Sequence, residues 1–119
     1  MQLASSLALE ALKELRNNPK IKASAMVSKD GLVIASDVPP GVYVDTFSIM
    51  CATILGAAAT ADSELKLSPP KRIVVSAEDG NIIILNAGRK TLAVLVTTKD
   101  ADPDKIVEES QAIIAKVAS

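Results

Sequence analysis

The sequence contains no histidine, one cysteine and very few aromatic residues, and each scarcity removes a class of function. Without histidine, both the commonest general base and the commonest metal ligand of proteins are missing. Aromatic residues make up 2% of the chain, too few for the stacking platforms that bind nucleic-acid bases or for a sugar-binding cleft. The net charge of -1 offers no basic surface to nucleic acid or to an anionic membrane. We therefore expect no nucleic-acid partner.

The single cysteine, Cys51, excludes an internal disulfide and is typical of a reducing cytoplasm, which is the location that we expect. It lies in an apolar helical stretch, which indicates a buried packing residue rather than a nucleophile. A phosphate-binding loop, a GxSxG motif and metal-spaced Cys/His pairs are all absent from the sequence. The sequence therefore predicts no catalytic residue, no metal site and no cofactor.

The residues that are present describe one globular domain over residues 1–119. Hydrophobic residues make up 49% of the chain and charged residues 23%, as in folded domains. The N-terminus lacks the basic start and unbroken apolar core of a signal peptide. Apolar periodicity and turn residues predict the order α-β-β-α-β-β-β-α. The predicted ranges are a helix at 2–17, strands at 21–28 and 32–36 around Asp30-Gly31, a helix from 43–45 to about 65, strands at 72–78, 81–87 and 91–98, and a helix capped by Asp102.

Two of the predicted strands are apolar on both faces, at Ile82–Leu85 and Leu92–Val96. Strands of this kind are covered on both sides. A five-stranded, mostly antiparallel sheet with three helices must then carry two helices on one face and one on the other. The first and last helices show apolar stripes that suit the shared face. These stripes are Leu7, Ala8, Ala11, Leu12 and Leu15, and Ile106, Val107, Ser110, Ile113, Ile114 and Val117.

The middle helix has no charged residue between Thr46 and Ala61. These sixteen residues are fewer than the roughly 20 apolar residues that span a bilayer, and they include serine, threonine and glycine. We therefore predict no integral membrane segment. On a helical wheel the larger residues gather on one side and are expected to face the sheet. They are Tyr43, Phe47, Met50, Cys51, Ile54, Ala58, Ala61 and Leu65.

The opposite side of this helix carries mostly small residues: Ile49, Ala52, Thr53, Gly56, Thr60 and Ser63. The spacing of 49, 53, 56 and 60 is typical of a helix–helix seam. Because the other two helices are expected on the far face of the sheet, we predict that a second copy of the chain covers this side about a two-fold axis. Alternatively, the segment DVPPGVY folds over it, or its hydroxyl groups meet water.

The strand at 72–78 supports self-association because it pairs with only one neighbour in the predicted meander. An open strand edge needs protection or a partner. Pairing with its symmetry mate would join two five-stranded sheets into one of ten. The predicted interface therefore comprises Ile49, Ala52, Thr53, Gly56 and Thr60 on the helix, with Arg72 and Val74 on the strand.

The hairpin SKDGLVIAS, the helix ATILGAAATADSEL and the hairpin EDGNIIILNAG occur in an order that resembles the Roadblock/LC7 family over essentially the whole chain. The resemblance implies a profilin/longin-like fold and dimers formed through the central helix and the third strand. It also implies a non-catalytic regulator or scaffold of a small Ras-like GTPase, most similar to the stand-alone prokaryotic type. The dimer would be a homodimer or a pair with a related Roadblock chain.

Two other functions fit the sequence, a dynein-light-chain-like adaptor and a small-ligand sensor domain. The sensor is disfavoured because a sheet covered on both faces leaves little room for a cavity. An arginine finger is a further question for a GTPase regulator, and Arg89 lies in a predicted turn. We expect Arg89 to be an ordinary surface cation, and any stimulation of hydrolysis to act through the residues of the GTPase.

Overall fold

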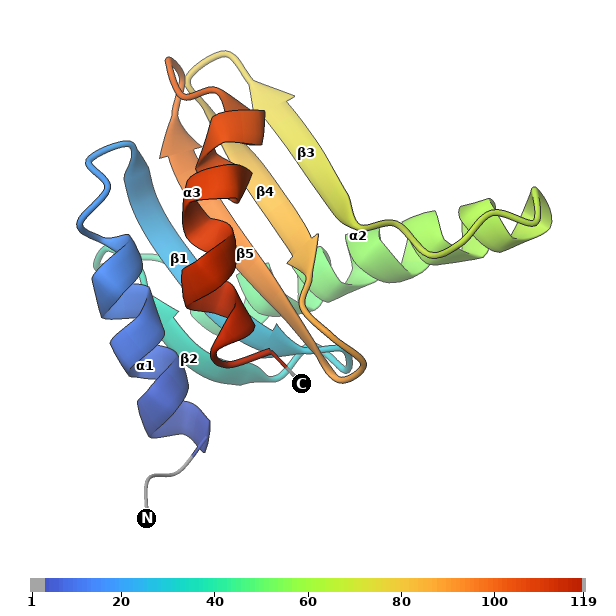
Figure 1. The fold of residues 1–119 in the computed structure, drawn as a ribbon, viewed down its shortest axis with the longest axis horizontal. Helices are drawn as coiled ribbons and strands as arrows, with labels where there is room; N and C mark the ends of the chain where they lie inside the picture. Colours follow the sequence, from blue (N-terminus) through green and yellow to red (C-terminus); the bar gives the residue numbers. More distant parts are fainter. Residues whose placement is uncertain (1–3, 119) are drawn as a thin grey trace.

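The computed structural model describes residues 4–118 and contains the eight elements in the predicted order (Figure 1). Positions 2 and 3 of the first predicted helix lie outside the described residues. Predicted and observed boundaries agree to within two residues elsewhere, as the following bounds show. The elements are α1 (Ala4–Leu15), β1 (Ile21–Ser28), β2 (Val33–Asp37), α2 (Val44–Glu64), β3 (Arg72–Ala77), β4 (Gly80–Asn86), β5 (Thr91–Thr98) and α3 (Pro103–Ala115).

The five strands form one antiparallel sheet in the order β2-β1-β5-β4-β3. The first hairpin and the later meander are joined by the pairing of β1 with β5, so β2 and β3 are the two edges. The turn between β1 and β2 uses Gly31 at φ +91°, a conformation that favours glycine. A Cβ on Gly31 would also lie 3.2 Å from the Cα atom of Ile49, because the first half of α2 passes over this turn.

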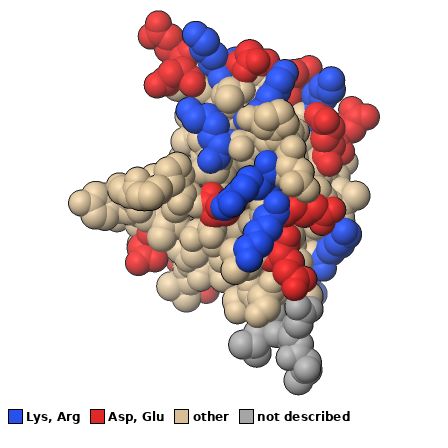
Figure 2. Space-filling view, turned by 90° about the vertical axis from the view of Figure 1, so that its left-hand side faces the viewer, with Lys and Arg blue, Asp and Glu red and all other residues tan. Residues whose placement is uncertain are grey.

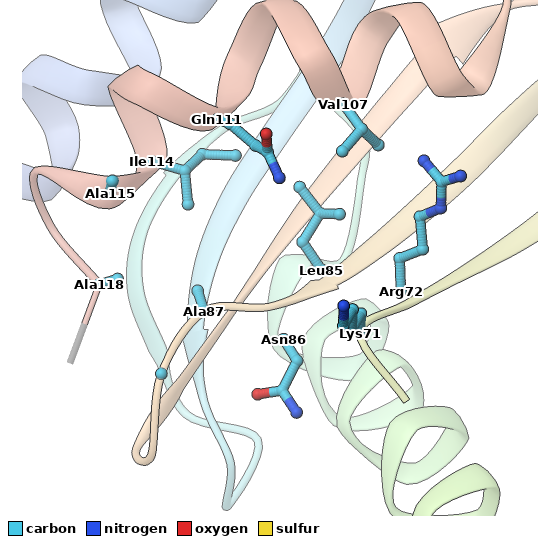
Figure 3. A pocket seen from close by; sticks show the side chains of 11 residues that line it. Lys71, Arg72, Leu85, Asn86, Ala87, Val107, Gln111, Ile114, Ala115 and Ala118 are labelled. Carbon is cyan, nitrogen blue, oxygen red and sulfur yellow. The ribbon is translucent and has the colours of Figure 1, made fainter. Parts of the chain in front are cut away.

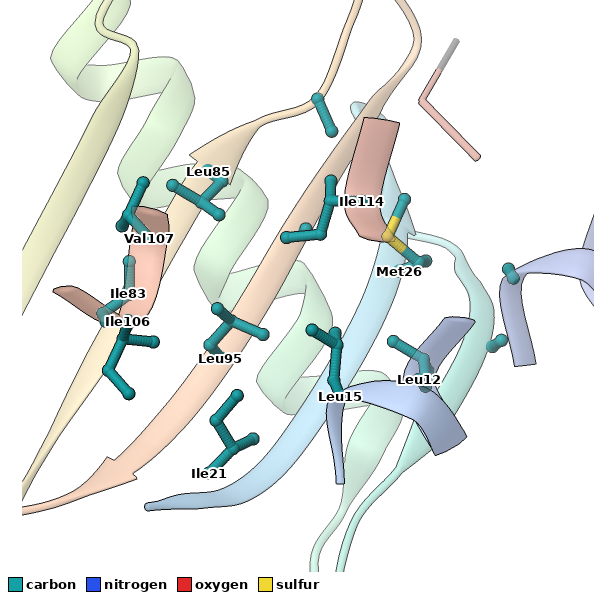
Figure 4. Close-up of a cluster of buried hydrophobic side chains, with 14 of the residues drawn as sticks. Leu12, Leu15, Ile21, Met26, Ile83, Leu85, Leu95, Ile106, Val107 and Ile114 are labelled. Carbon is teal, nitrogen blue, oxygen red and sulfur yellow. The ribbon is translucent and has the colours of Figure 1, made fainter. Parts of the chain in front are cut away.

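Helices cover both faces of the sheet, two on one side and one on the other, as predicted (Figure 1). The larger core lies under α1 and α3 and includes Leu12, Met26 and Leu95 (Figure 4). The smaller core lies under α2 and includes Leu55 and Val94. Successive residues of β4 and β5 alternate between the two cores, which is why these strands are apolar throughout their length.

The first and last helices follow their predicted stripes with one exception. In α3, Ile106, Val107, Ser110 and Ile114 are buried, and Asp102 caps the helix by accepting a hydrogen bond from the amide of Asp104 at 3.0 Å. The other two stripe positions, Ile113 and Val117, are half-buried. In α1, Ala8, Ala11, Leu12 and Leu15 are buried. Leu7 was predicted to be buried and is 40% exposed, because it lies at the rim of the stripe.

The predicted orientation of α2 is partly wrong. Phe47 and Cys51 do face the sheet and Ala58 is half-buried, but the remaining large residues face outward, and the buried positions of the helix are Ser48, Cys51 and Leu55. A helix without charged residues offers no polar face from which its rotation can be read, and residue size alone assigned it incorrectly. The residues predicted to be buried that the structure exposes are Tyr43, Met50, Ile54, Ala61 and Leu65.

Candidate interface on α2 and β3

The second half of α2 extends beyond the sheet (Figure 1). The chain leaves the sheet at the β2 edge and re-enters at the β3 edge, so α2 must cross all five strands. Four gaps between strands of about 4.8 Å each give a width of roughly 19 Å. The 21 residues of α2 are about 31 Å long at 1.5 Å per residue. The excess length is why residues 56–64 contain no buried side chain.

The outer face of α2 combines large apolar and small residues and carries no charge from Thr46 to Ala61. Ile49 is 48% exposed and Met50 is 51% exposed. The predicted seam residues Ile49, Thr53, Gly56 and Thr60 lie on this face, whereas Ala52 is half-buried and packs against the core under α2. Met50 and Ile54 belong to the same outer face, so the prediction that they face the sheet is wrong.

The hydroxyl groups on this face are bonded to the helix itself. Thr53 donates to the carbonyl oxygen of Ile49 at 2.8 Å, and Thr60 donates to that of Gly56 at 3.1 Å. Ser63 donates to the carbonyl oxygen of Thr60 at 2.8 Å. Such back-bonding uses the donor and leaves the threonine methyl groups as contact surface. The face is therefore less polar than its composition indicates, which weakens the alternative that these hydroxyl groups simply meet water.

Gly56 lies in this face, and no packing within residues 4–118 requires a glycine there. A Cβ at Gly56 would meet no described heavy atom within 4 Å, apart from its chain neighbours and the nearby backbone of α2. Glycine inside a helix is about 1 kcal/mol less favourable than alanine. No described residue therefore accounts for a glycine at this position of the helix.

The segment before α2 does not cover the helix. In the predicted alternative, DVPPGVY folds over the outer face, but Val42 is 42% exposed and Tyr43 is 85% exposed. Within the described residues, Ile49 and Met50 remain open to solvent beside it. Figure 2 shows the molecule from the left of Figure 1. Basic and acidic side chains are intermixed on this face, and one protruding part of the surface has no charged side chain. This view shows no large patch of one sign.

The edge strand β3 is exposed along almost its whole length, as predicted for a terminal strand. The amide of Asn86 donates to the carbonyl oxygen of Lys71 at 3.0 Å. This bond determines which residues of β3 form backbone hydrogen bonds with β4. Odd-numbered residues of β3 therefore bond to β4, and the backbone groups of Arg72, Val74 and Ser76 point outward. These groups form an edge to which another strand can add.

The two predicted β3 residues lie on the α3 side of the sheet. Val74 pairs with Ile83, whose side chain belongs to the core under α1 and α3. Arg72 forms an ion pair with Asp104 at the start of α3. The α2 side of the edge is formed instead by Ile73 and Val75, which the sequence argument did not include. Val75 could have been included from the sequence, because a terminal strand exposes apolar residues on both of its faces.

A membrane is the other environment that could cover α2. Among the described residues, α2 is the one helix with the length and composition to span a bilayer. Its uncharged stretch of sixteen residues is about 24 Å long, shorter than the roughly 30 Å of the hydrocarbon layer. The first half of α2 also contacts β1, β2 and β4, and lipid would have to replace these contacts. The length of the uncharged stretch and these contacts disfavour a bilayer as the surroundings of α2.

Cys51 and Arg89 are the two residues for which the sequence raised the question of a chemical role. Cys51 is 2% exposed, and burial raises the pKa of its thiol to about 11. The thiolate form that acts as a nucleophile is therefore disfavoured near neutral pH. Arg89 is exposed beside the β4–β5 turn. Neither residue lies on the outer face of α2.

The model of the Roadblock/LC7 domain family matches residues 7–97. The chain belongs to this family. A protein of Methanocaldococcus jannaschii, the uncharacterized MJ0714, is 34% identical over 97 residues, which cover 82% of each chain. This agrees with the resemblance seen in the hairpins and the central helix. Family membership supports a regulator-type role, and the match indicates no enzyme family.

Solved structures show the same fold at low sequence identity. The gliding protein MglB from Thermus thermophilus aligns with a TM-score of 0.82 at 19% identity, over 99% of this chain and 93% of that one. A structure described as MglB with tetrameric arrangement has the same TM-score and identity, over 99% and 92%. Profilin from Schizosaccharomyces pombe aligns with a TM-score of 0.67 at 14% identity, over 92% and 95%. The predicted profilin-like Roadblock fold is confirmed.

Proposed function

We propose that this chain forms a dimer through α2 and β3, and that the paired α2 helices are the platform for a small Ras-like GTPase whose activity or location the dimer regulates. The observation that carries this proposal is the uncharged outer face of α2, which no described residue covers. Membership of the Roadblock/LC7 family and the likeness to an MglB of tetrameric arrangement support self-association. The buried, reduced Cys51 is in keeping with a cytoplasmic location.

The spacing of the outer face suits two antiparallel copies of α2. Ile49, Thr53, Gly56 and Thr60 recur at intervals of four, three and four residues along one side. Gly56 lets a second helix approach closely, and Ile49 supplies apolar area beside it. A closed two-fold dimer requires such a self-complementary patch.

Charges at the start of β3 and just past its end favour one register for the paired strands, because Arg72 is the first residue of β3 and Glu78 is the first residue of the turn after it. Because only Arg72, Val74 and Ser76 point their backbone groups outward, these even-numbered residues must form the hydrogen-bonded pairs. A two-fold axis at Val75 places Arg72 opposite Glu78 of the second copy. An axis at Val74 would place Arg72 opposite Ser76. Opposite charges directly across a sheet contribute about 0.2–1 kcal/mol, so we propose the register centred on Val75.

Charge reversal tests this register. Arg72→Glu and Glu78→Arg should each place like charges opposite one another twice per dimer and raise its dissociation constant about tenfold. The double variant should restore the affinity. Asp104→Asn is the control, because it removes the ion pair of Arg72 within the chain without changing β3. Single variants that dimerise like the wild type in sedimentation equilibrium would rule out this register.

The platform is tested by the mass of the protein and by binding to GTPases. Light scattering should report twice the 12.4 kDa of the chain, and Gly56→Glu should return it to one chain because it places an uncompensated charge in the seam. Ala112→Glu, at an exposed position on α3, is the matched control. A monomeric wild type would refute the proposal. Co-expression with related Roadblock chains distinguishes a homodimer from a mixed pair.

Purified Ras-like GTPases from the same genome should bind the wild type more tightly with a GTP analogue than with GDP. The Gly56→Glu variant should lose this binding, whereas Ala112→Glu should keep it. If no such GTPase binds, or if the monomeric variant binds as well as the dimer, the α2 platform is wrong. Loss of any GTPase stimulation in Arg89→Ala would instead assign Arg89 as an arginine finger.

A further inference from the structure

A cavity of about 490 Å³ lies between α3 and the junction of β3 and β4, on the face of the sheet opposite α2 (Figure 3). It forms because α3 leaves the neighbouring edge strand uncovered on this side. A cavity of this size is not expected from the sequence, in which a sheet covered on both faces leaves little room. Cavities that hold small molecules have volumes of about 300–1,000 Å³, so this one is large enough for a ligand.

The floor of the cavity is apolar and built from small or branched side chains. Leu85 lies near the end of β4 and Ala87 just after it, and Val107 and Ile114 lie on α3; all four belong to the core under α1 and α3. At one end, Ala115 and Ala118 leave room that larger residues would fill. An apolar body of a ligand would bury its surface here.

The other end of the cavity is cationic. Figure 3 shows Arg72 extending from the β3 side toward α3 and Gln111 reaching in from α3, whereas Lys71 lines the same edge of the cavity with its side chain seen end-on. Arg72 shares its charge with Asp104, and Lys71 forms no ion pair with another residue in 4–118. Two cations and one carboxylate leave an excess of one positive charge next to an apolar floor. The amide of Gln111 adds a hydrogen-bond donor between the two regions.

We propose that this cavity binds a small amphiphilic anion, a monocarboxylate with an apolar body of about eight carbons. The carboxylate lies by Lys71 and the free donors of Arg72, and the hydrocarbon body lies over Leu85, Val107 and Ile114. The site is on the opposite face from the outer surface of α2, so this inference does not depend on dimerisation.

Titration of the full chain with octanoate, followed by the methyl resonances of the protein, tests the proposal. The methyl groups of Leu85, Val107 and Ile114 should shift and saturate, whereas those of Leu55 and Val94 under α2 should not. Each methylene added to the carboxylate should tighten binding up to about fourfold. Octanol, which lacks the charge, should bind up to about fivefold more weakly.

Paired variants locate the ligand. Ala115→Leu fills the apolar end and should abolish binding, whereas Ala112→Leu, exposed on α3 outside the cavity, should not. Lys71→Gln should reduce the affinity for octanoate to that for octanol, and Lys22→Gln, at an exposed position on β1, should leave it unchanged. Shifts without saturation, equal shifts under α2, or wild-type binding by Ala115→Leu would overturn the proposal. Each variant's fold is checked by its unperturbed β2 and α2 resonances.

Discussion

Replacing Gly56 by alanine should have opposite effects on the single chain and on the dimer. In the single chain, a methyl group at Gly56 has open space around it. Alanine is about 1 kcal/mol more favourable than glycine within a helix, which multiplies the ratio of folded to unfolded monomer about fivefold. The variant monomer should therefore be more stable than the wild-type monomer.

In the proposed dimer the same methyl group would lie where two α2 helices cross. Overpacking of a close contact costs about 1–3 kcal/mol, so the dissociation constant should rise about five- to 150-fold. The two effects have different signs, and no property of the isolated chain can produce both. A glycine that serves only as a flexible joint would show the first effect without the second.

Sedimentation equilibrium measures the dissociation constant, and urea denaturation above and below that concentration measures the free energy of unfolding of dimer and monomer. Ser6→Ala, on the exposed side of α1, is the control, because it also improves helix propensity but lies far from the seam. If Gly56→Ala stabilises the protein equally at both concentrations and leaves the dissociation constant unchanged, then α2 does not form the proposed seam.

Three further substitutions test the structure itself. Leu55→Ala should lower the free energy of unfolding by about 2–5 kcal/mol in urea denaturation, because Leu55 is 4% exposed and anchors α2 on the sheet. Asp102→Ala should lower it by about 1 kcal/mol, seen as a lower melting temperature, through loss of the α3 cap. Burial raises the pKa of Cys51 from 9.0 to about 11, so the unfolded chain ionises first as the pH rises. The free energy of unfolding of the wild type should thus fall relative to Cys51→Ala between about pH 9 and 11, with parallel values below pH 9 in urea denaturation.

Local signals were enough to predict the architecture. Two elements could be predicted from their own residues alone. The strand at 91–98 has consecutive apolar residues, which place apolar side chains on both of its faces, and the last helix begins with the cap Asp102 followed by Pro103. The turn at Gly31 needed only its glycine. The two-to-one division of the helices followed from strands that are apolar on both sides.

The rotation of α2 could not be predicted in the same way. Its sheet contacts are made by Ser48, Cys51 and Leu55, whereas the larger Met50 faces outward. A helix that contacts one surface within the chain and offers another for association has two apolar faces, so size and hydropathy do not distinguish them. The extension of α2 past β3 depends on the order of the strands in the sheet, and no single segment of the sequence determines that order. The cavity under α3 likewise depends on how far that helix lies from the sheet edge.

The pairing of β1 with β5 also determines when the molecule can fold during synthesis. Those strands lie at residues 21–28 and 91–98, and the β1–β5 ladder is the sole connection between the two halves of the sheet in the described part of the chain. Because α2 precedes β3, β4 and β5 in the chain, it is synthesised before three of the five strands of the sheet that supports it. Its apolar surface is then open to other nascent chains and to chaperones. Completion of β5 ends that interval, and the last strand therefore closes the sheet that the central helix needs.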